Sequence, residues 1–424
     1  MTSEQDLETL TFHVIQENGE NKILILDSKQ RVEDEFSIGA LEVSLLEKKD
    51  KFVIAQCPND IEYVWNLDDL NHPPKIHGLN PAILCASKEF LEALYPKSHK
   101  PDRKKILYAA RDFMAEVTGD RLERSYASLE VQVPTAAMRI IPLGIGNANP
   151  QNSLGNSCFL LEADKKYLID FPKGAPPENI KDIFITHVHN DHLGSLVDFL
   201  LVNGPKEDPK ERVNIYTISK IREQLISILN LLGLKTRWGW EPGELWKNVD
   251  VTNFANLITL EEALSESGAD KDISYTTKSG LKIETRWNMH GDTPSIGLKF
   301  NYKNRKLGIS GDCNINRNYI CHKYAELLYL IVGYNVAPNV KLENLIEKTR
   351  EQYAKKCINW FNDCNLIFHE ATSKNVAGNV HTFIGDLEKE LAHQKDKLFV
   401  YHIEDSGFKS DIFPLAQRGR TYRV

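Results

Sequence analysis

The feature that most constrains the fold of this chain is a run of metal-binding side chains directly after an apolar stretch. The segment from Thr186 to His192 reads Thr-His-Val-His-Asn-Asp-His. Side chains alternate across a strand, so His187 and His189 can point the same way. Asp191 and His192 then begin a helix and turn back toward the same space. Imidazoles and a carboxylate that converge at one strand end suit Zn²⁺, Mn²⁺ or Fe²⁺, so we expect a metal site here.

The length of 424 residues favours two domains. Residues 1–135 are predicted to form an α+β domain, which contains no side-chain pattern of catalytic type. Its strands include a hairpin around the polar turn 47–51 and a further strand at 63–65. Two helices are predicted within residues 87–119.

Residues 136–424 mix strands and helices throughout, as in a layered α/β protein. Strands are predicted at 138–146, 157–161, 167–170, 183–186, 213–217, 283–287, 296–301, 307–310, 366–368 and 398–401. Helices are predicted at 191–202, 221–232 and 342–361. Two insertions are expected, near 233–272 and 314–365. The first carries Trp238, Trp240 and Trp246, which are predicted to bury apolar area, with base stacking as the alternative.

Further histidines and acids follow later predicted strands. The segments are Met289-His290-Gly291-Asp292, Ser310-Gly311-Asp312, Phe368-His369-Glu370-Ala371-Thr372, His381-Thr382 and Tyr401-His402. Together with the His-rich run, they make residues 138–402 resemble the metallo-β-lactamase superfamily. Within it, the chain is most similar to ribonuclease Z-like and cyclic-nucleotide phosphodiesterase-like members.

The resemblance implies an αββα sandwich that holds two divalent metal ions, with zinc expected and manganese or iron as alternatives. It assigns one ion to His187, His189 and His290, the other to Asp191, His192 and His402, and the bridge to Asp312. Asp191 is expected to be catalytic as well. It also implies an outer supporting role for Asp170, although the following Phe171-Pro172 departs from the small pair that is common in the family.

The resemblance further implies how the leaving group receives its proton. His369 is expected to be the proton donor, Glu370 to orient it, and His381 to lie at the phosphate side of the site. A histidine can supply such a proton near neutral pH.

The fold alone does not fix the substrate. The His-Glu-Ala-Thr stretch favours phosphodiesters, and in many ribonuclease Z relatives an arm that grips transfer RNA lies between the matching third ligand and the bridging aspartate. Here that gap has room only for two strands and the turn 303–306. A small phosphodiester such as a cyclic nucleotide is therefore predicted, and transfer RNA is not expected. The alternatives are an ester, thioester or lactone hydrolase and an RNA-processing nuclease.

Composition limits the partners and the cellular setting. The net charge of −7 gives no overall basic field for a large nucleic acid. Seven scattered cysteines, with no C-x-x-C pair, suit a reducing compartment. The polar start shows no secretory signal, and no apolar stretch approaches the roughly 20 residues of a membrane span. We expect a cytoplasmic protein without a membrane partner, and a homo-oligomer is compatible with the sequence.

Overall fold

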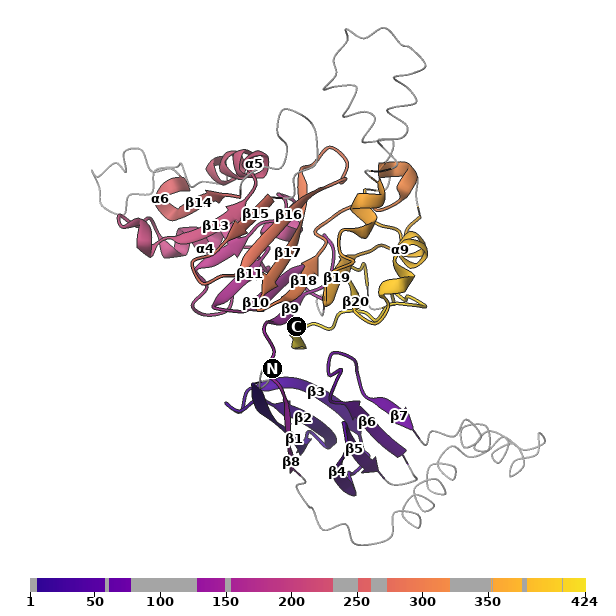
Figure 1. The fold of residues 1–424 in the computed structure, drawn as a ribbon. Coiled ribbons are helices and arrows are strands. Elements are labelled where there is room, and N and C mark those ends of the chain that lie inside the picture. Colours follow the sequence, from indigo (N-terminus) through magenta and orange to yellow (C-terminus); the bar gives the residue numbers. More distant parts are fainter. Residues whose placement is uncertain are drawn as a thin grey trace, which may run out of the picture. The chain divides into compact units, whose positions relative to one another are not determined.

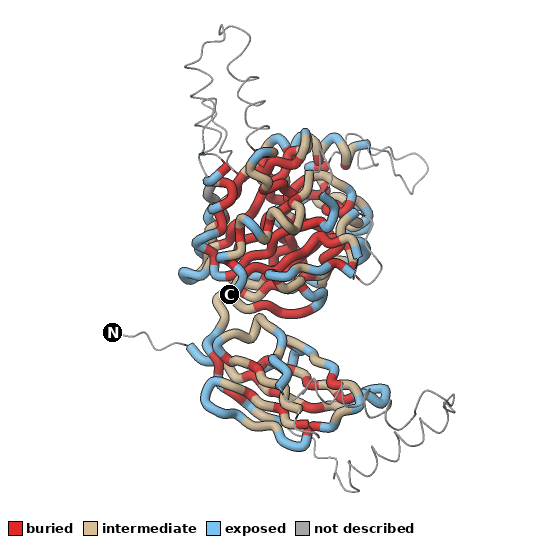
Figure 2. The backbone as a smooth tube through the Cα atoms, turned by 90° about the vertical axis from the view of Figure 1, so that its right-hand side faces the viewer, coloured by how far each residue is buried: buried red, intermediate tan, exposed pale blue. Residues whose placement is uncertain are grey.

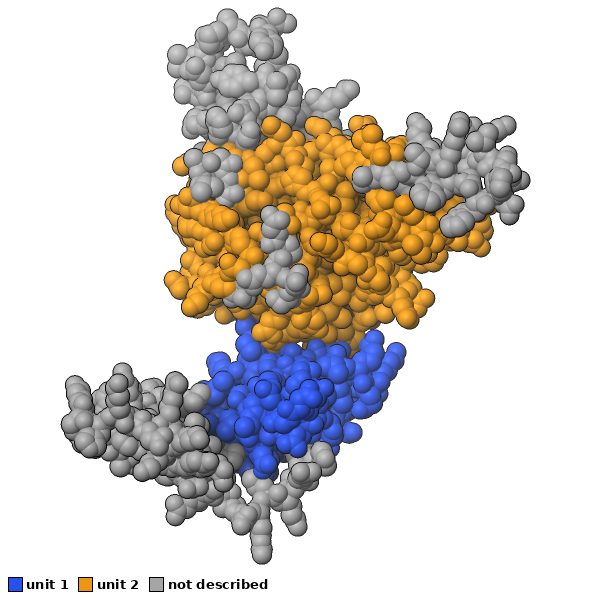
Figure 3. All heavy atoms as spheres, turned by 180° about the vertical axis from the view of Figure 1, so that it is seen from behind, with its two compact units in different colours: residues 1–135 blue, residues 136–424 orange. Residues whose placement is uncertain are grey.

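The computed structural model describes residues 6–57, 61–77, 128–148, 154–231, 251–260, 273–320, 352, 354–375, 380–405 and 407–424. The chain divides into two compact units, residues 1–135 and 136–424 (Figures 1 and 3). Several predicted features lie outside the described residues: the two helices within 87–119, Trp238, Trp240 and Trp246, and most of the helix at 342–361.

The first unit contains two antiparallel sheets of four strands. One sheet has the order β3-β2-β1-β8, with β1 Leu7–Glu17, β2 Glu20–Leu26, β3 Val32–Gly39 and β8 Ser128–Pro134. The other has the order β4-β5-β6-β7, with β4 Leu45–Lys49, β5 Phe52–Cys57, β6 Ile61–Asn66 and β7 Lys75–His77.

Aromatic side chains join these two sheets face to face. The Trp65 ring on β6 meets Phe12 of β1 at a centroid distance of 5.4 Å and Phe36 of β3 at 5.5 Å, both edge-on. Buried and less buried residues alternate along β2 and β5, which is the pattern of strands with one face in a core. Figure 2 shows buried, intermediate and exposed positions along the strands of the unit. Edge-to-face packing adds to the burial of these large side chains.

The strands predicted in this unit are present, with one change at the hairpin. The turn is tighter than predicted, because Lys49 already pairs with Phe52 and only Asp50 and Lys51 connect the strands. Asp50 has a positive φ of 52°, which a short hairpin turn requires.

The second unit contains two mixed sheets. The seven-stranded sheet has the order β14-β13-β12-β11-β10-β9-β21, with β9 Arg139–Gly144, β10 Cys158–Glu162, β11 Lys166–Ile169, β12 Asp182–Phe184, β13 Val213–Thr217, β14 Ala255–Thr259 and β21 Tyr422–Arg423. The six-stranded sheet has the order β15-β16-β17-β18-β19-β20, with β15 Ile273–Thr276, β16 Lys282–Asn288, β17 Ser295–Tyr302, β18 Arg305–Ile309, β19 Leu366–Glu370 and β20 Leu398–Tyr401.

Helices flank the two sheets of this unit (Figure 1). They are α3 Asn190–Leu193, α4 Leu196–Asn203, α5 Ser219–Leu229, α6 Val251–Phe254 and α9 Ile384–Leu391, with short 3₁₀ turns η1 Pro209–Glu211 and η3 Ala392–Gln394. Figure 1 shows α4, α5 and α6 beside the first sheet and α9 beside the second. The predicted α/β class is thus confirmed for this unit. Among its described helices, none is long and apolar enough to cross a membrane.

The main apolar core of this unit lies between the two sheets. Phe159 of β10 contacts Phe368 of β19 at a ring distance of 5.2 Å, and Phe184 of β12 contacts Phe300 of β17 at 5.3 Å. Each of these rings is at most 2% exposed. The near-continuous apolar strands of the sequence reflect this burial on both faces.

Two predicted elements differ from the structure. The helix predicted at 191–202 is broken into α3 and α4 at Gly194, whose φ is 46°. A Cβ atom there would collide with the carbonyl oxygens of Phe171 and Pro172, so only glycine fits. The insertion predicted at 233–272 contains β14, which pairs in parallel with β13 and so belongs to the sheet.

The strand directions explain where a site can form. β11 and β12 run parallel in the first sheet, and β18, β19 and β20 run parallel in the second. Functional residues of open α/β sheets commonly lie beyond the carboxyl ends of such strands. Six of the seven predicted ligands follow ends of these parallel strands, and His290 follows β16, which pairs antiparallel with β15 and β17.

Candidate metal centre

The candidate metal centre draws residues from strand ends of both sheets. The seven predicted ligands are His187, His189, Asp191 and His192 after β12, His290 after β16, Asp312 after β18 and His402 after β20. The structure brings all seven together in two adjoining clusters that share Asp312.

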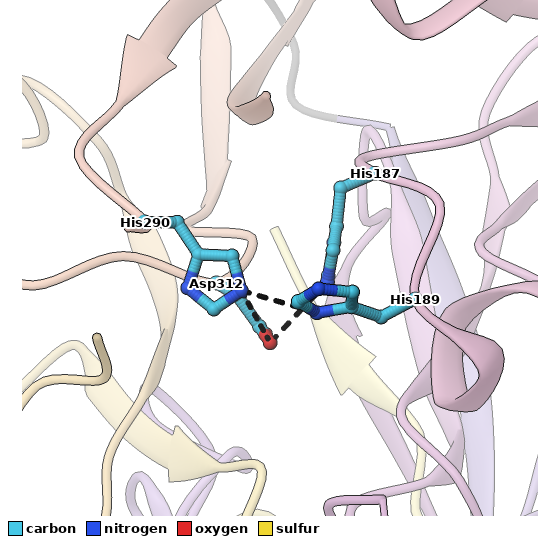
Figure 4. A group of neighbouring side chains, drawn as sticks. All are labelled: His187, His189, His290 and Asp312. Atoms are coloured by element: carbon cyan, nitrogen blue, oxygen red, sulfur yellow. Dashed lines mark hydrogen bonds and ion pairs between the residues drawn. The ribbon is translucent and has the colours of Figure 1, made fainter. Parts of the chain in front are cut away.

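The first cluster consists of His187, His189, His290 and Asp312, whose donor atoms all lie within 4.8 Å of one another (Figure 4). The Nε2 atoms of His187 and His290 lie 3.4 and 3.8 Å from Asp312 Oδ2. His189 Nδ1 lies 3.2 Å from His290 Nε2. Three imidazoles facing one carboxylate form a set that fits a divalent cation.

The second cluster consists of Asp191, His192, His402 and the same Asp312. His192 Nε2 lies 3.2 Å from Asp312 Oδ1, and His402 Nε2 lies 3.3 Å from Oδ2. His402 Nε2 also lies 3.1 Å from Asp191 Oδ2. Both oxygens of Asp312 therefore face imidazole nitrogens, as a bridging carboxylate requires.

Buried polar atoms without hydrogen-bond partners support this reading. Among the described residues, His187 Nε2, His192 Nε2 and both carboxylate oxygens of Asp312 are buried without such a partner. Leaving polar groups buried and unsatisfied is costly, and native proteins mostly avoid it. All four atoms point into the clusters, so the donor set fits metal ions.

Protonation in the two clusters also favours cation binding. Burial lowers the pKa of His290 to about 3 and that of His187 to about 4, so both rings are neutral at pH 7 and offer lone pairs. Burial opposes charge on His192 too, but the carboxylates of Asp312 and Asp170 outweigh it and raise its pKa. A metal ion can balance the negative charge of the carboxylates around His192 in place of a proton.

Asp170 holds His192 from behind. Its Oδ2 accepts a hydrogen bond from His192 Nδ1 at 2.7 Å, and its Oδ1 accepts from the Thr186 backbone N–H at 2.8 Å. The Thr186 hydroxyl contacts both Asp170 oxygens and lies 3.1 Å from His187 Nδ1. Phe171-Pro172 does not disturb this arrangement, because the Phe171 N–H donates to the His192 carbonyl at 2.8 Å.

Two other ligands have partners that sequence reasoning missed. His189 Nε2 lies 3.2 Å from the Thr293 hydroxyl, and His290 Nδ1 lies 3.2 Å from the Val380 carbonyl oxygen. Such partners fix the ring orientation and tautomer of a ligating histidine. A hydroxyl and a backbone carbonyl have no sequence signature of their own, so only the fold reveals these contacts.

We expect Asp170→Asn to weaken metal binding by about 10–100-fold, the usual effect of losing an outer partner of a ligand. The amide keeps the shape but cannot hold the His192 N–H with a full negative charge. Titration of the apoprotein with Zn²⁺ in competition with a chelator measures the affinity. The exposed helix residue Asp198 provides the control variant Asp198→Asn, which should bind as the native chain does. Equal affinities for the two variants would contradict the role of Asp170.

The structure separates His369 from the ligands, contrary to its predicted role as proton donor. His369 and Glu370 are neighbours on β19, and side chains of adjacent strand residues point to opposite faces. His369 Nδ1 bonds the backbone carbonyl of Glu370 at 2.8 Å, and its Nε2 lies 3.9 Å from Cys313 Sγ. The ring is 1% exposed and packs near Phe361, away from the clusters.

His381, in contrast, lies beside the centre and is paired with Glu370. Its Nδ1 lies 3.4 Å from Glu370 Oε2 and 3.7 Å from Asp312 Oδ2. Its side chain is 26% exposed, against 1% for Asp312, so it can meet a substrate. Burial opposes its charge, but the Glu370 carboxylate outweighs this effect and raises the pKa of His381 to about 9. The carboxylate of Glu370 thus faces His381, while its backbone carbonyl bonds His369.

Comparison with known proteins gives one family match. Residues 138–333 match the family described as Anti-Pycsar protein Apyc1. This segment contains six of the seven ligands, while His402 and the Glu370–His381 pair lie beyond it.

Curated relatives match over shorter stretches. A UPF0173 metal-dependent hydrolase of Pyrococcus horikoshii is 42% identical over 62 residues, 12% of this chain and 28% of the relative. A second, from Thermococcus kodakarensis, is 34% identical over 89 residues, 19% of this chain and 38% of the relative. The chain therefore spans well under half the length of the curated relatives that it matches.

The solved structures to which this chain is similar include a metallo-β-lactamase fold protein and a tRNase Z. YhfI of Bacillus subtilis is 12% identical, with a TM-score of 0.41, over 68% of this chain and 99% of that one. The short form of human tRNase Z is 17% identical, with a TM-score of 0.43, over the same shares. With its two sheets, flanking helices and ligand order, the chain resembles the metallo-β-lactamase superfamily, whose fold residues 136–424 adopt.

Proposed function

We propose that this chain is a dinuclear metal-dependent phosphodiesterase that acts on a small phosphodiester such as a cyclic nucleotide. The observation that carries the proposal is the partly exposed His381 beside the shared ligand Asp312, held by the buried carboxylate of Glu370. A phosphodiester with an alkoxide leaving group needs both charge neutralisation and a proton donor. Metal ions held by the two clusters would neutralise the charge, and His381 would donate the proton.

Ions bound by the two clusters would lower the pKa of a water molecule and neutralise charge on the phosphate oxygens. The residues of the chain arrange the rest of the reaction. The water oxygen forms a bond to phosphorus, and the bond from phosphorus to the leaving oxygen breaks. His381 gives its proton to that leaving oxygen, and Glu370 stabilises the imidazolium before transfer, as its effect on the His381 pKa indicates.

The segment between His290 and Asp312 supports a small substrate. β17 and β18 are joined by the two-residue turn Lys303–Asn304, in which both residues have positive φ. The whole segment is described, and it contains no arm that could grip an RNA helix. The net charge of −7 also gives no long-range attraction for a large polyanion.

A substrate comparison tests the proposal. We expect the metal-loaded protein to hydrolyse cyclic AMP or cyclic GMP, as well as bis-p-nitrophenyl phosphate, and to leave precursor transfer RNA intact at moderate salt. Asp312→Asn, assayed in parallel, controls for contaminating phosphodiesterases. Efficient cutting of the RNA without turnover of small phosphodiesters would contradict the proposal. Rapid hydrolysis of p-nitrophenyl acetate or a lactone alone would favour the ester-hydrolase alternative.

A further inference from the structure

Thr382 is a fully buried residue that joins the segment of the proton donor to the segment of the shared ligand. We propose that Thr382 is a positioning residue, whose hydroxyl sets the place of His381 relative to Asp312. This inference rests on the proposed function of His381 as proton donor. It assigns the role to a side chain that neither binds metal nor titrates.

Three hydrogen bonds fix Thr382 to two other segments, the one that ends β19 and the one that follows β18. Its backbone N–H donates to Glu370 Oε1 at 2.8 Å, and its hydroxyl donates to the Cys313 carbonyl oxygen at 2.9 Å. Its own carbonyl oxygen accepts from the Thr372 N–H at 2.8 Å. Since Thr382 directly follows His381 and Cys313 directly follows Asp312, the hydroxyl bond links the segment of the donor to the segment of the ligand.

The same contacts also determine which oxygen of Glu370 meets His381. The Cys313 N–H donates to Glu370 Oε1 at 3.2 Å, so this oxygen receives two backbone donors, from Cys313 and Thr382. Only Oε2 then remains to face His381 Nδ1, at 3.4 Å. Thr382, Cys313 and Glu370 thus form a closed ring of hydrogen bonds that holds the carboxylate in one orientation.

Loss of the hydroxyl opens this ring at the link to Cys313. The backbone N–H of Thr382 would still reach Glu370, but the donor segment could shift against Asp312. We therefore expect a defect in proton transfer and not in metal binding. Outer partners of this kind typically change activity by about 10–100-fold when removed.

The test compares Thr382→Val, which keeps the shape, with Thr382→Ser, which keeps the hydroxyl. The substrates are methyl phenyl phosphate and methyl p-nitrophenyl phosphate, which differ only in how much their leaving groups need a proton. We expect Thr382→Val to lower kcat for the phenyl ester by about 10–100-fold, with little effect on the nitrophenyl ester. Thr382→Ser should restore most of the activity, and metal content should be unchanged in both variants.

A matched control separates positioning from stability. Tyr216→Phe removes another buried hydroxyl, which donates to Asp182 at 2.8 Å. Asp182 is the first residue of β12, whereas predicted ligands follow the last residue of that strand. It should lower Tm as Thr382→Val does, without any dependence on the leaving group. Equal loss on both esters for Thr382→Val, or no rescue by serine, would show a merely structural role and overturn the inference.

Hydrogen exchange of the metal-free protein gives a readout that needs no activity. Amides of residues 381–384 should exchange faster in Thr382→Val than in the native chain or Thr382→Ser, while those of β19 stay protected. Unchanged exchange in this segment would overturn the inference even if the protein hydrolyses phosphodiesters. If the activity loss in His381→Ala does not depend on the leaving group, the proposed function of His381 is wrong. The hydrogen-exchange result then still decides whether Thr382 positions its segment.

Discussion

Replacement of Asp312 by asparagine is expected to remove both metal ions and nearly all activity. Asp312 faces both clusters: Oδ2 lies 3.4 Å from His187 Nε2 in the first and 3.3 Å from His402 Nε2 in the second, and Oδ1 lies 3.2 Å from His192 Nε2. An amide nitrogen at either position cannot ligate a cation, and the lost negative charge affects both sites. The loss should exceed the 10–100-fold that is typical of an outer partner.

Elemental analysis of the reconstituted and dialysed protein measures this effect. The native chain should retain roughly two ions, as two-metal hydrolases do. Asp312→Asn should retain less than one, and the exposed Asp198→Asn should match the native chain. A variant that still holds a full complement of metal would show that Asp312 does not bridge.

Replacement of His381 by alanine is expected to lower turnover strongly on poor leaving groups while leaving metal content intact. General acid catalysis typically contributes 10²–10⁴-fold. The defect on methyl phenyl phosphate should fall in that range, and it should shrink on methyl p-nitrophenyl phosphate, whose phenolate departs without a proton. Steady-state kcat for the two esters gives the measurement.

His369→Asn is the informative companion variant, because sequence alone assigns the donor role to His369. Its ring is buried against Cys313 and the backbone of Glu370, so the variant should lower Tm. Relative to the native chain, kcat of this variant should fall by the same factor on the poor and on the good leaving group. A selective loss on the poor leaving group in His369→Asn, with none in His381→Ala, would restore the original assignment.

The clustering of the candidate ligands could be predicted because their chemistry and their spacing both carry information. His187 and His189 stand two residues apart after an apolar strand, and Asp312 follows a strand that is recognisable by its own apolar residues. The structure then places these predicted ligands where strand ends from two sheets meet.

The proton donor role that the resemblance implies for His369 differs from the role that we propose for His381. His369 and His381 both lie near Glu370 in the sequence, and choosing between them requires the face of β19 on which each group lies. Because adjacent residues of a strand point to opposite faces, Glu370 faces the candidate metal centre and His369 lies on the other face of β19. The supporting hydroxyls of Thr186, Thr293 and Thr382 escaped prediction for a similar reason, since threonine is common in strands and turns.

Strand β14 shows a second limit. Its residues Ala255–Thr259 are only partly apolar and follow a polar stretch, so the sequence placed them in an insertion. Among the described strands, β14 is an edge strand that pairs only with β13, so it needs fewer apolar residues than the central strands.

The ligands of each cluster come from both sheets of the sandwich, so a bound ion would act as a cross-link. It would tie the turn after β12 to His290 and Asp312 in one cluster and to His402 in the other, closing chain loops of more than a hundred residues. An ion that binds the folded state and dissociates on unfolding adds stability by mass action. Chelation of the metal should therefore lower the free energy of unfolding. Depletion of metal in the cell would then make this chain more susceptible to proteolysis and also remove its activity.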